Sequence, residues 1–257
     1  MSETVVEKNN YKVIPWGPVA AVIVTTLTYA MSQIMAGMLL WIYPIYKGWD
    51  EKTATSWLAS SPYIQFVFVL VVEVIALWFL WMFLKGRLAR PSQLGLRAPR
   101  TRDVGYALTG FVAYFSLYLV LLTVMQKLIP SLNTDQKQEL GFATDTGGVA
   151  LVAVFISLVI LPPIVEEIMT RGFLYSGLRS KLPKVVAAII TSILFAVAHL
   201  QFGSGNSLLW VAAIDTFILS MVLVYLRDKT DSLWSPFMLH GLKNTIAFVS
   251  IFVLHLS

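Results

Sequence analysis

The chain has 257 residues, of which 57% are hydrophobic and only 13% are charged, and its mean hydropathy is +0.74. Soluble domains carry about a quarter charged residues, so a soluble globular class is excluded. The net charge of +5 comes from basic residues in short loops between apolar blocks, where they set membrane orientation, and we expect no nucleic-acid partner. The absence of cysteine excludes a thiol nucleophile, disulfides and iron–sulfur chemistry.

The apolar residues come in blocks of about 20, the length at which a helix crosses roughly 30 Å of hydrocarbon. Pro162 and Pro163 are expected to break the helix of the fourth block, which leaves an eighth span as an alternative to seven. The predicted fold is all-α: a polytopic transmembrane bundle of seven or eight spans in one integral membrane domain, residues 1–257, with the lipid bilayer around it. In chain order the predicted spans are Val13–Tyr43, Tyr63–Leu84, Val104–Ile129, Gly147–Leu178, Val185–Phe202, Leu208–Leu226 and Ser235–Leu256.

The orientation follows from the basic residues. The N-terminal stretch MSETVVEKNNYK lacks the features of a cleaved signal, so the first span is predicted to be a retained anchor. Six basic residues fall in one loop, which should be cytoplasmic: Lys85, Arg87, Arg90, Arg97, Arg100 and Arg102. Alternation puts Lys8, Lys12, Arg179, Lys181, Lys184, Arg227 and Lys229 on the same side, and leaves Lys47, Lys52, Lys127 and Lys137 on the other. This pattern predicts a cytoplasmic N-terminus and seven crossings.

Polar side chains inside the spans are the candidate functional residues, because an ionisable group there costs at least a few kcal/mol. The alternative is that they only pack helices or lie near headgroups. The candidates are Glu73, Glu166, Glu167, Arg171, His199, Asp215, His240, Lys243 and Asn244.

The first group lies in LPPIVEEIMTRGFL. Glu167 and Arg171 are four residues apart, so they share a helix face and can neutralise each other. Glu166 is turned about 100° away and is free to point into a cavity. A buried glutamate without a dedicated cation suits a general base. The alternative is a salt-bridge cluster at a helix end.

Two further groups have the spacing of one helical turn. In ILFAVAHLQFG, the Phe195 ring can pack beside the His199 imidazole. In SPFMLHGLKNT, His240 and Asn244 share a face, and two N–H donors one turn apart can hold the oxygen of a tetrahedral intermediate. Gly241 permits close approach of a neighbouring helix or of a substrate backbone. The estimated depths of Glu166, His199 and His240 are similar, which indicates one site.

These three motifs, Glu166-Glu167-x-x-x-Arg171, Phe195-x-x-x-His199 and His240-x-x-x-Asn244, resemble those of the type II CAAX prenyl endopeptidase family. That family, called CPBP, includes the bacterial ABI or bacteriocin-immunity proteins. The resemblance covers about residue 151 to the end. It implies a catalytic core in residues 147–257, preceded by N-terminal spans in residues 1–146, and an active site inside the membrane.

The resemblance implies an intramembrane endopeptidase in which Glu166 and His199 activate water and His240 and Asn244 stabilise the oxyanion. Arg171 would fix Glu167 and the motif helix, and Phe195 would support the site. No metal is favoured, because the chain lacks HExxH and asparagine is a good oxyanion donor but a poor zinc ligand. The alternative is a divalent metal such as zinc held by Glu166, His199 and His240.

The implied substrate is a membrane-embedded or lipidated protein or peptide, with CAAX-type prenylated proteins among the candidates. The compact chain favours a bacterial cell membrane, where we expect some other membrane-associated peptide. Two departures from the family pattern leave substrate choice open. Thr170 stands where relatives often carry phenylalanine, and the span with Asp215 lacks glycines common there.

Other intramembrane proteases fit less well. Gly203-Ser204-Gly205 lacks the spacing of a rhomboid GxSG serine, and neither HExxH nor GxGD occurs. One rival from another class is an ion-coupled transporter with Glu73, Glu166 and Asp215 as relays, which the absence of a repeat disfavours. A second is a non-catalytic immunity or partner-binding membrane protein that retains the motifs.

Overall fold

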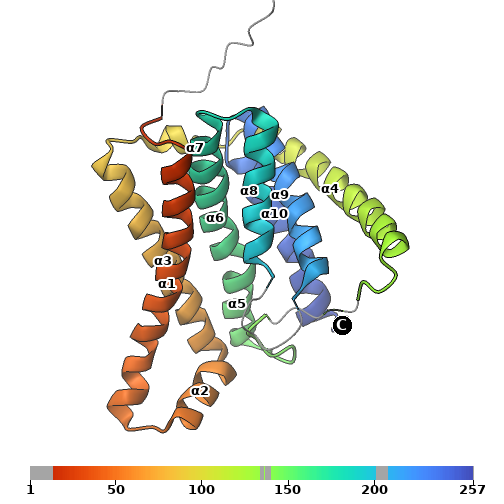
Figure 1. Ribbon diagram of the computed structural model, residues 1–257. Coiled ribbons are helices and arrows are strands. Elements are labelled where there is room, and N and C mark those ends of the chain that lie inside the picture. Colours follow the sequence, from red (N-terminus) through yellow and green to blue (C-terminus); the bar gives the residue numbers. More distant parts are fainter. Residues whose placement is uncertain (1–13, 134–135, 137–139, 201–207, 257) are drawn as a thin grey trace, which may run out of the picture.

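The computed structural model describes residues 14–133, 136, 140–200 and 208–256. Within these ranges every regular element is helical and no strand forms. Six helical segments are long and apolar enough to cross a membrane, and a shorter apolar helix joins them. The fold is therefore a polytopic all-α bundle, as the sequence predicts (Figure 1). Lys8, Lys12, Lys137 and the Gly203–Gly205 stretch lie outside the described residues.

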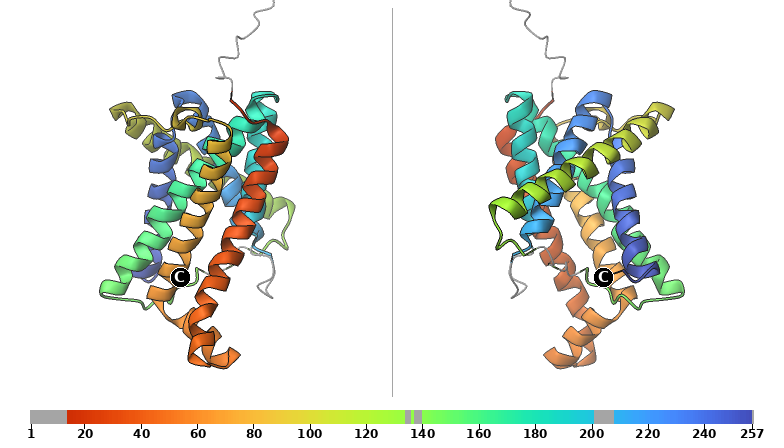
Figure 2. Two further views of the ribbon diagram at one scale, coloured as in Figure 1. Left: turned by 90° about the vertical axis from the view of Figure 1, so that its left-hand side faces the viewer. Right: turned by 90° about the vertical axis from the view of Figure 1, so that its right-hand side faces the viewer.

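The N-terminal half contributes three long helices and one short one. Their bounds are α1 (Pro18–Lys47), α2 (Glu51–Ser60), α3 (Pro62–Gly86) and α4 (Thr101–Leu128), with a short 3-10 turn at Pro91–Leu94 between the last two. α1 packs against α3, whereas α4 runs obliquely and packs on α9 and α10 (Figures 1 and 2).

The C-terminal half contains the predicted motifs. Its helices are α5 (Val149–Phe155), α6 (Leu161–Glu167), α7 (Tyr175–Arg179), α8 (Lys184–Ala198), α9 (Trp210–Thr230) and α10 (Trp234–Phe248). π-helical turns occupy Ile156–Ile160, Ile168–Leu174 and Val249–Val253. α6 contacts both α3 and α10, and α8 packs on α9, so the motif helix is enclosed by its neighbours.

The predicted break at Pro162 and Pro163 is not a break between two spans. Residues 149–179 form one helical segment, α5 to α7, so the eighth span does not form. A π-helical turn precedes the prolines, in which Leu161 N–H bonds to the Ile156 carbonyl, and α6 restarts with the prolines in its first turn. A first-turn proline tolerates the missing N–H, so the helix continues.

Two features differ from the predicted spans: the end of α8 and an additional short helix, α2. α8 ends at Ala198, not at Phe202, and His199 follows it with φ −97° and ψ 5°. Its 15 residues rise only about 22 Å, less than the ~30 Å of a bilayer core, so the helix is too short to cross that core alone.

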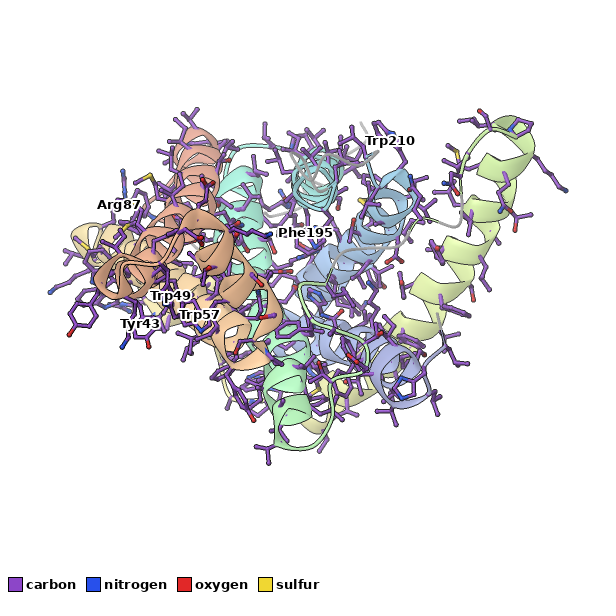
Figure 3. All side chains as sticks on the ribbon, turned by 90° about the horizontal axis from the view of Figure 1, so that it is seen from below. Tyr43, Trp49, Trp57, Arg87, Phe195 and Trp210 are labelled. Carbon is purple, nitrogen blue, oxygen red and sulfur yellow. The ribbon has the colours of Figure 1, made fainter. Side chains whose placement is uncertain are left out.

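The second difference is α2, which hydropathy does not reveal because it has only ten residues of mixed polarity. The Asp50 carboxylate caps it by accepting a hydrogen bond from the Thr53 N–H at 2.7 Å. Trp57 of α2 packs with Tyr43 and Trp49, with ring centroids 5.2–5.6 Å apart (Figure 3). Clustered aromatic rings at a helix end are typical of a membrane–water interface.

Close packing holds α1 against the motif helix. The Trp16 indole N–H donates to the Phe173 carbonyl at 3.0 Å, and the two rings stack 5.2 Å apart. A Cβ at Gly177 would lie 2.4 Å from the Ala21 Cβ and 2.8 Å from Trp16. The glycine is therefore required for this contact.

We expect Gly177→Ala to lower the thermal stability of the purified protein in detergent, by about 1–3 kcal/mol, as overpacking does. Gly105→Ala is the matched control, because this helical glycine has open space where the methyl group would go. Melting curves that are equal for the two variants would contradict the close packing of α1 on α7.

Candidate active site

The Glu167–Arg171 pair lies at the centre of the bundle. Both side chains are fully buried, and Arg171 Nη1 donates to Glu167 Oε1 at 3.0 Å, which confirms the pairing expected from the spacing. The guanidinium lies 4.3 Å from the centroid of the Phe195 ring. The centroid of the Phe195 ring also lies 4.6 Å from that of the His199 ring and 6.1 Å from that of the His240 ring. Phe195 therefore packs between the three polar groups. Seen from below, it lies near the middle of the bundle, and Trp210 lies at its edge (Figure 3).

Thr170, the residue in the place of the family's phenylalanine, is part of the polar network. Its hydroxyl donates to the Glu166 carbonyl at 2.5 Å and accepts from Arg171 Nη1 at 2.7 Å. The hydroxyl thus gives the buried guanidinium a second acceptor, which a phenylalanine ring could not supply.

His240 reaches from α10 to both glutamates. Its Nδ1 lies 2.9 Å from Glu167 Oε1, and its Nε2 lies 3.9 Å from Glu166 Oε2. A carboxylate only accepts, so Nδ1 carries the hydrogen and Nε2 faces Glu166. The sequence did not predict this contact, because it joins residues 73 positions apart.

His199 is oriented by its own helix end. Its Nδ1 lies 2.8 Å from the Phe195 carbonyl oxygen. A carbonyl cannot donate, so the proton is on Nδ1, and Nε2 is the basic atom of the neutral ring. The end of α8 at Ala198 makes this bond possible, because it turns the His199 backbone out of the helix.

Asn244 is tied to the double proline. The Leu158 carbonyl would normally accept from residue 162 in an α-helix or from residue 163 in a π-helix, and both are prolines without an N–H. Asn244 Nδ2 donates to this carbonyl at 2.9 Å. One of the two amide hydrogens is therefore used in structure, and the other remains for a ligand.

The four predicted catalytic residues line one cavity of about 1140 Å³. They are Glu166, His199, His240 and Asn244, from three helical segments of the bundle. Glu167, Arg171 and Phe195 lie behind them and do not line it. The structure thus brings together every residue of the predicted site, with the supporting residues in a buried layer underneath.

A second polar cluster, which the motifs do not contain, places Asp215 and Lys243 on the same cavity wall. Lys243 Nζ is 3.0 Å from Asp215 Oδ2, and the Tyr114 hydroxyl donates to Asp215 Oδ1. Asp215 and Lys243 were candidates as isolated charges inside spans, whereas Tyr114 carried no signal in the sequence. Glu73 is buried on α3 with one carboxylate oxygen unpartnered among the described residues, and it does not line the cavity.

The alternative metal site was tested on the donor set. Across the described ranges, no group of three His, Asp or Glu side chains is arranged to hold a metal ion. Glu166 Oε2 and His240 Nε2 are 3.9 Å apart, and the Nδ1 bonds of His240 to Glu167 and of His199 to a carbonyl leave Nε2 free in both rings, as in metal-ligating histidines. In this arrangement Glu166, His199 and His240 are not gathered as a three-ligand group.

We expect Glu167→Ala to reduce membrane yield and thermal stability, because it leaves a buried arginine without its carboxylate, a loss of about 3–5 kcal/mol. Glu166→Ala is the matched control: it removes the neighbouring carboxylate, which is partly exposed to the cavity and has no arginine partner. The two variants would be compared by fluorescence size-exclusion profiles and melting in detergent. Equal stability would contradict the buried role of Glu167.

Comparison with known proteins agrees with the motifs. The family model described as type II CAAX prenyl endopeptidase Rce1-like matches residues 148–246, a range that contains Glu166, His199, His240 and Asn244. No curated protein and no solved structure matches the chain. The apolar helices make the chain an integral membrane protein, and its residues 148–246 match a peptidase family. The match over residues 148–246 supports the resemblance of the three motifs to the type II CAAX prenyl endopeptidase (CPBP) family.

Proposed function

We propose that the protein is an intramembrane endopeptidase that hydrolyses a peptide bond of a membrane-associated protein or peptide. One observation carries this proposal: a glutamate, two histidines and an asparagine from three helical segments converge on one cavity. Such groups together supply a base and hydrogen-bond donors, which is what acyl transfer to water requires.

In the proposed reaction, Glu166 and His199 hold the attacking water. The Glu166 carboxylate takes a proton as the water oxygen bonds to the substrate carbonyl carbon. His199 Nε2, the unprotonated ring nitrogen, accepts the other hydrogen of the water and aims its lone pair. When the C–N bond breaks, the proton passes from Glu166 to the leaving nitrogen, so that protons balance.

The oxyanion would be held by His240 and Asn244. Asn244 donates the amide hydrogen that Leu158 does not use. His240 Nδ1 is held by Glu167, so Nε2 donates only when the ring carries both protons. In that form a cationic donor, paired with the Glu167 carboxylate, faces the charge that develops on the substrate oxygen. Glu167 is thus proposed as a positioning residue that acts through His240.

No step requires a resident metal in this proposal, since the cavity groups supply the base and the donors. We further propose that the N-terminus is cytoplasmic and that the protein resides in a bacterial cell membrane. The concentration of basic residues at one end of the bundle supports the orientation.

Glu166→Ala and His199→Ala should each abolish cleavage of a quenched, membrane-anchored peptide library by the purified protein. Activity is lost because Glu166 is needed to deprotonate the water and His199 to orient it, and neither residue can do both. Glu73→Gln is the matched control, a buried carboxyl on α3 that does not line the cavity, and it should retain cleavage.

Full activity of either variant would overturn the assigned base. Absence of cleavage by the unaltered protein, with binding of a partner retained, would favour the immunity or partner-binding reading. Loss of activity in Glu73→Gln together with proton-coupled flux in vesicles would favour the transporter.

Asn244→Ala should reduce turnover by about 10²–10³-fold, the usual effect of removing one oxyanion donor. It should also lower stability by about 1–3 kcal/mol, because the Leu158 carbonyl loses its buried donor. Thr245→Ala is the control, since Thr245 bonds only within its own helix, to the Gly241 carbonyl. If the stability of Asn244→Ala matched that of the control, the carbonyl cap would be wrong, and unchanged turnover would remove Asn244 from the oxyanion site.

A further inference from the structure

The cavity extends from Glu166 toward one end of the bundle only. Beyond the four proposed catalytic residues its wall includes Ala59 of α2, Ala143 and Thr144 of the α4–α5 connection, and Leu256 near the C-terminus. These segments all lie at the end where α2 and the start of α5 are found (Figures 1 and 2). The wall contains no residue of the segments 85–103, 179–184 or 227–234, at the opposite end.

The basic residues are concentrated at that opposite end. Described basic residues there are Lys85, Arg87, Arg90, Arg97, Arg100, Arg102, Arg179, Lys181, Lys184, Arg227 and Lys229, whereas the cavity end has Lys47, Lys52 and Lys127. An excess of lysine and arginine in short loops marks the cytoplasmic side of a membrane protein. The cavity therefore extends toward the end of the bundle opposite the basic loops.

The wall between the cavity end and Glu166 is mainly apolar. It carries Ala247, Phe248, Ile251 and Phe252 on one side, and the Lys243–Asp215 pair is its charged feature. Because lysine and aspartate neutralise each other, this wall has no net charge to attract or repel an ionic ligand. It fits an apolar peptide segment.

We propose that the cavity opens on the extracytoplasmic side, and that the substrate is an apolar peptide segment presented at that surface. The side on which the cavity opens is inferred from the wall residues and the charge distribution alone. That the bound peptide segment is a substrate rests on the proposed function. A C-terminal lipidated motif of a cytoplasmic protein would be on the wrong side of the membrane for this cavity.

The natural lack of cysteine allows a direct test with single-cysteine variants of the full chain. Ala247→Cys reports the cavity wall one turn beyond Lys243, Thr144→Cys reports the connection at its rim, and Arg102→Cys reports the basic end; all three positions are exposed. Each variant would be expressed in bacterial spheroplasts and treated with a membrane-impermeant sulfonated maleimide before or after lysis.

We expect most of the labelling of Ala247→Cys and Thr144→Cys to occur before lysis, and that of Arg102→Cys only after it. Labelling of Ala247→Cys only after lysis would overturn the proposed opening, as would labelling of Arg102→Cys in unlysed spheroplasts. Thr144→Cys, on a connecting loop, keeps the test informative if the helical variant does not fold.

The labelling requires no catalysis, so its failure is distinguishable from failure of the proposed function. Inverted labelling with cleavage that depends on Glu166 would reject the opening and retain the peptidase. Outward labelling without any cleavage would retain the opening and reject the peptidase.

Discussion

A membrane-spanning helix cannot leave a backbone carbonyl unpaired without a large free-energy cost, and the double proline creates such a carbonyl at Leu158. The π-helical turn at Ile156–Ile160 accommodates the prolines, and Asn244 of α10 supplies the missing donor. The same asparagine lines the cavity that Glu166 also lines. The geometry of the site thus depends on a structural requirement of the helix that carries the proposed base, because satisfying this carbonyl brings α10 to α6.

The buried arginine imposes a second requirement. Arg171 must be neutralised, and the Glu167 carboxylate that does so also receives His240 Nδ1. One carboxylate therefore fixes two helices and one ring tautomer, while Glu166, the next residue along the chain, is left facing the cavity. Adjacent glutamates acquire different environments because the helical repeat turns one inward and the other toward the open space. Phe195 completes the layer by covering the guanidinium.

The sequence predicted the elements that depend on local composition. Block length and hydropathy gave the spans, and four-residue spacings gave the Glu167–Arg171 pair. The contacts that join distant residues could not be predicted, since His240 to Glu167 and Asn244 to Leu158 depend on how α10 docks. The end of α8 at Ala198 and the short helix α2 were also missed, because hydropathy averages over turns and over ten-residue polar helices. Tyr114 gave no signal, because a tyrosine in an apolar span is ordinary until Asp215 is seen to accept its hydroxyl.

In the proposed mechanism, the polar groups of this cavity would hydrolyse a peptide bond by activating water without a resident metal. The most direct measurement is the turnover of a membrane-anchored peptide library by preparations of the protein whose metal content is determined by elemental mass spectrometry and then varied with chelators and added zinc. We predict that turnover is independent of bound metal and persists when metal is far below one ion per chain. Turnover proportional to bound zinc, and restored only by adding it, would contradict the account.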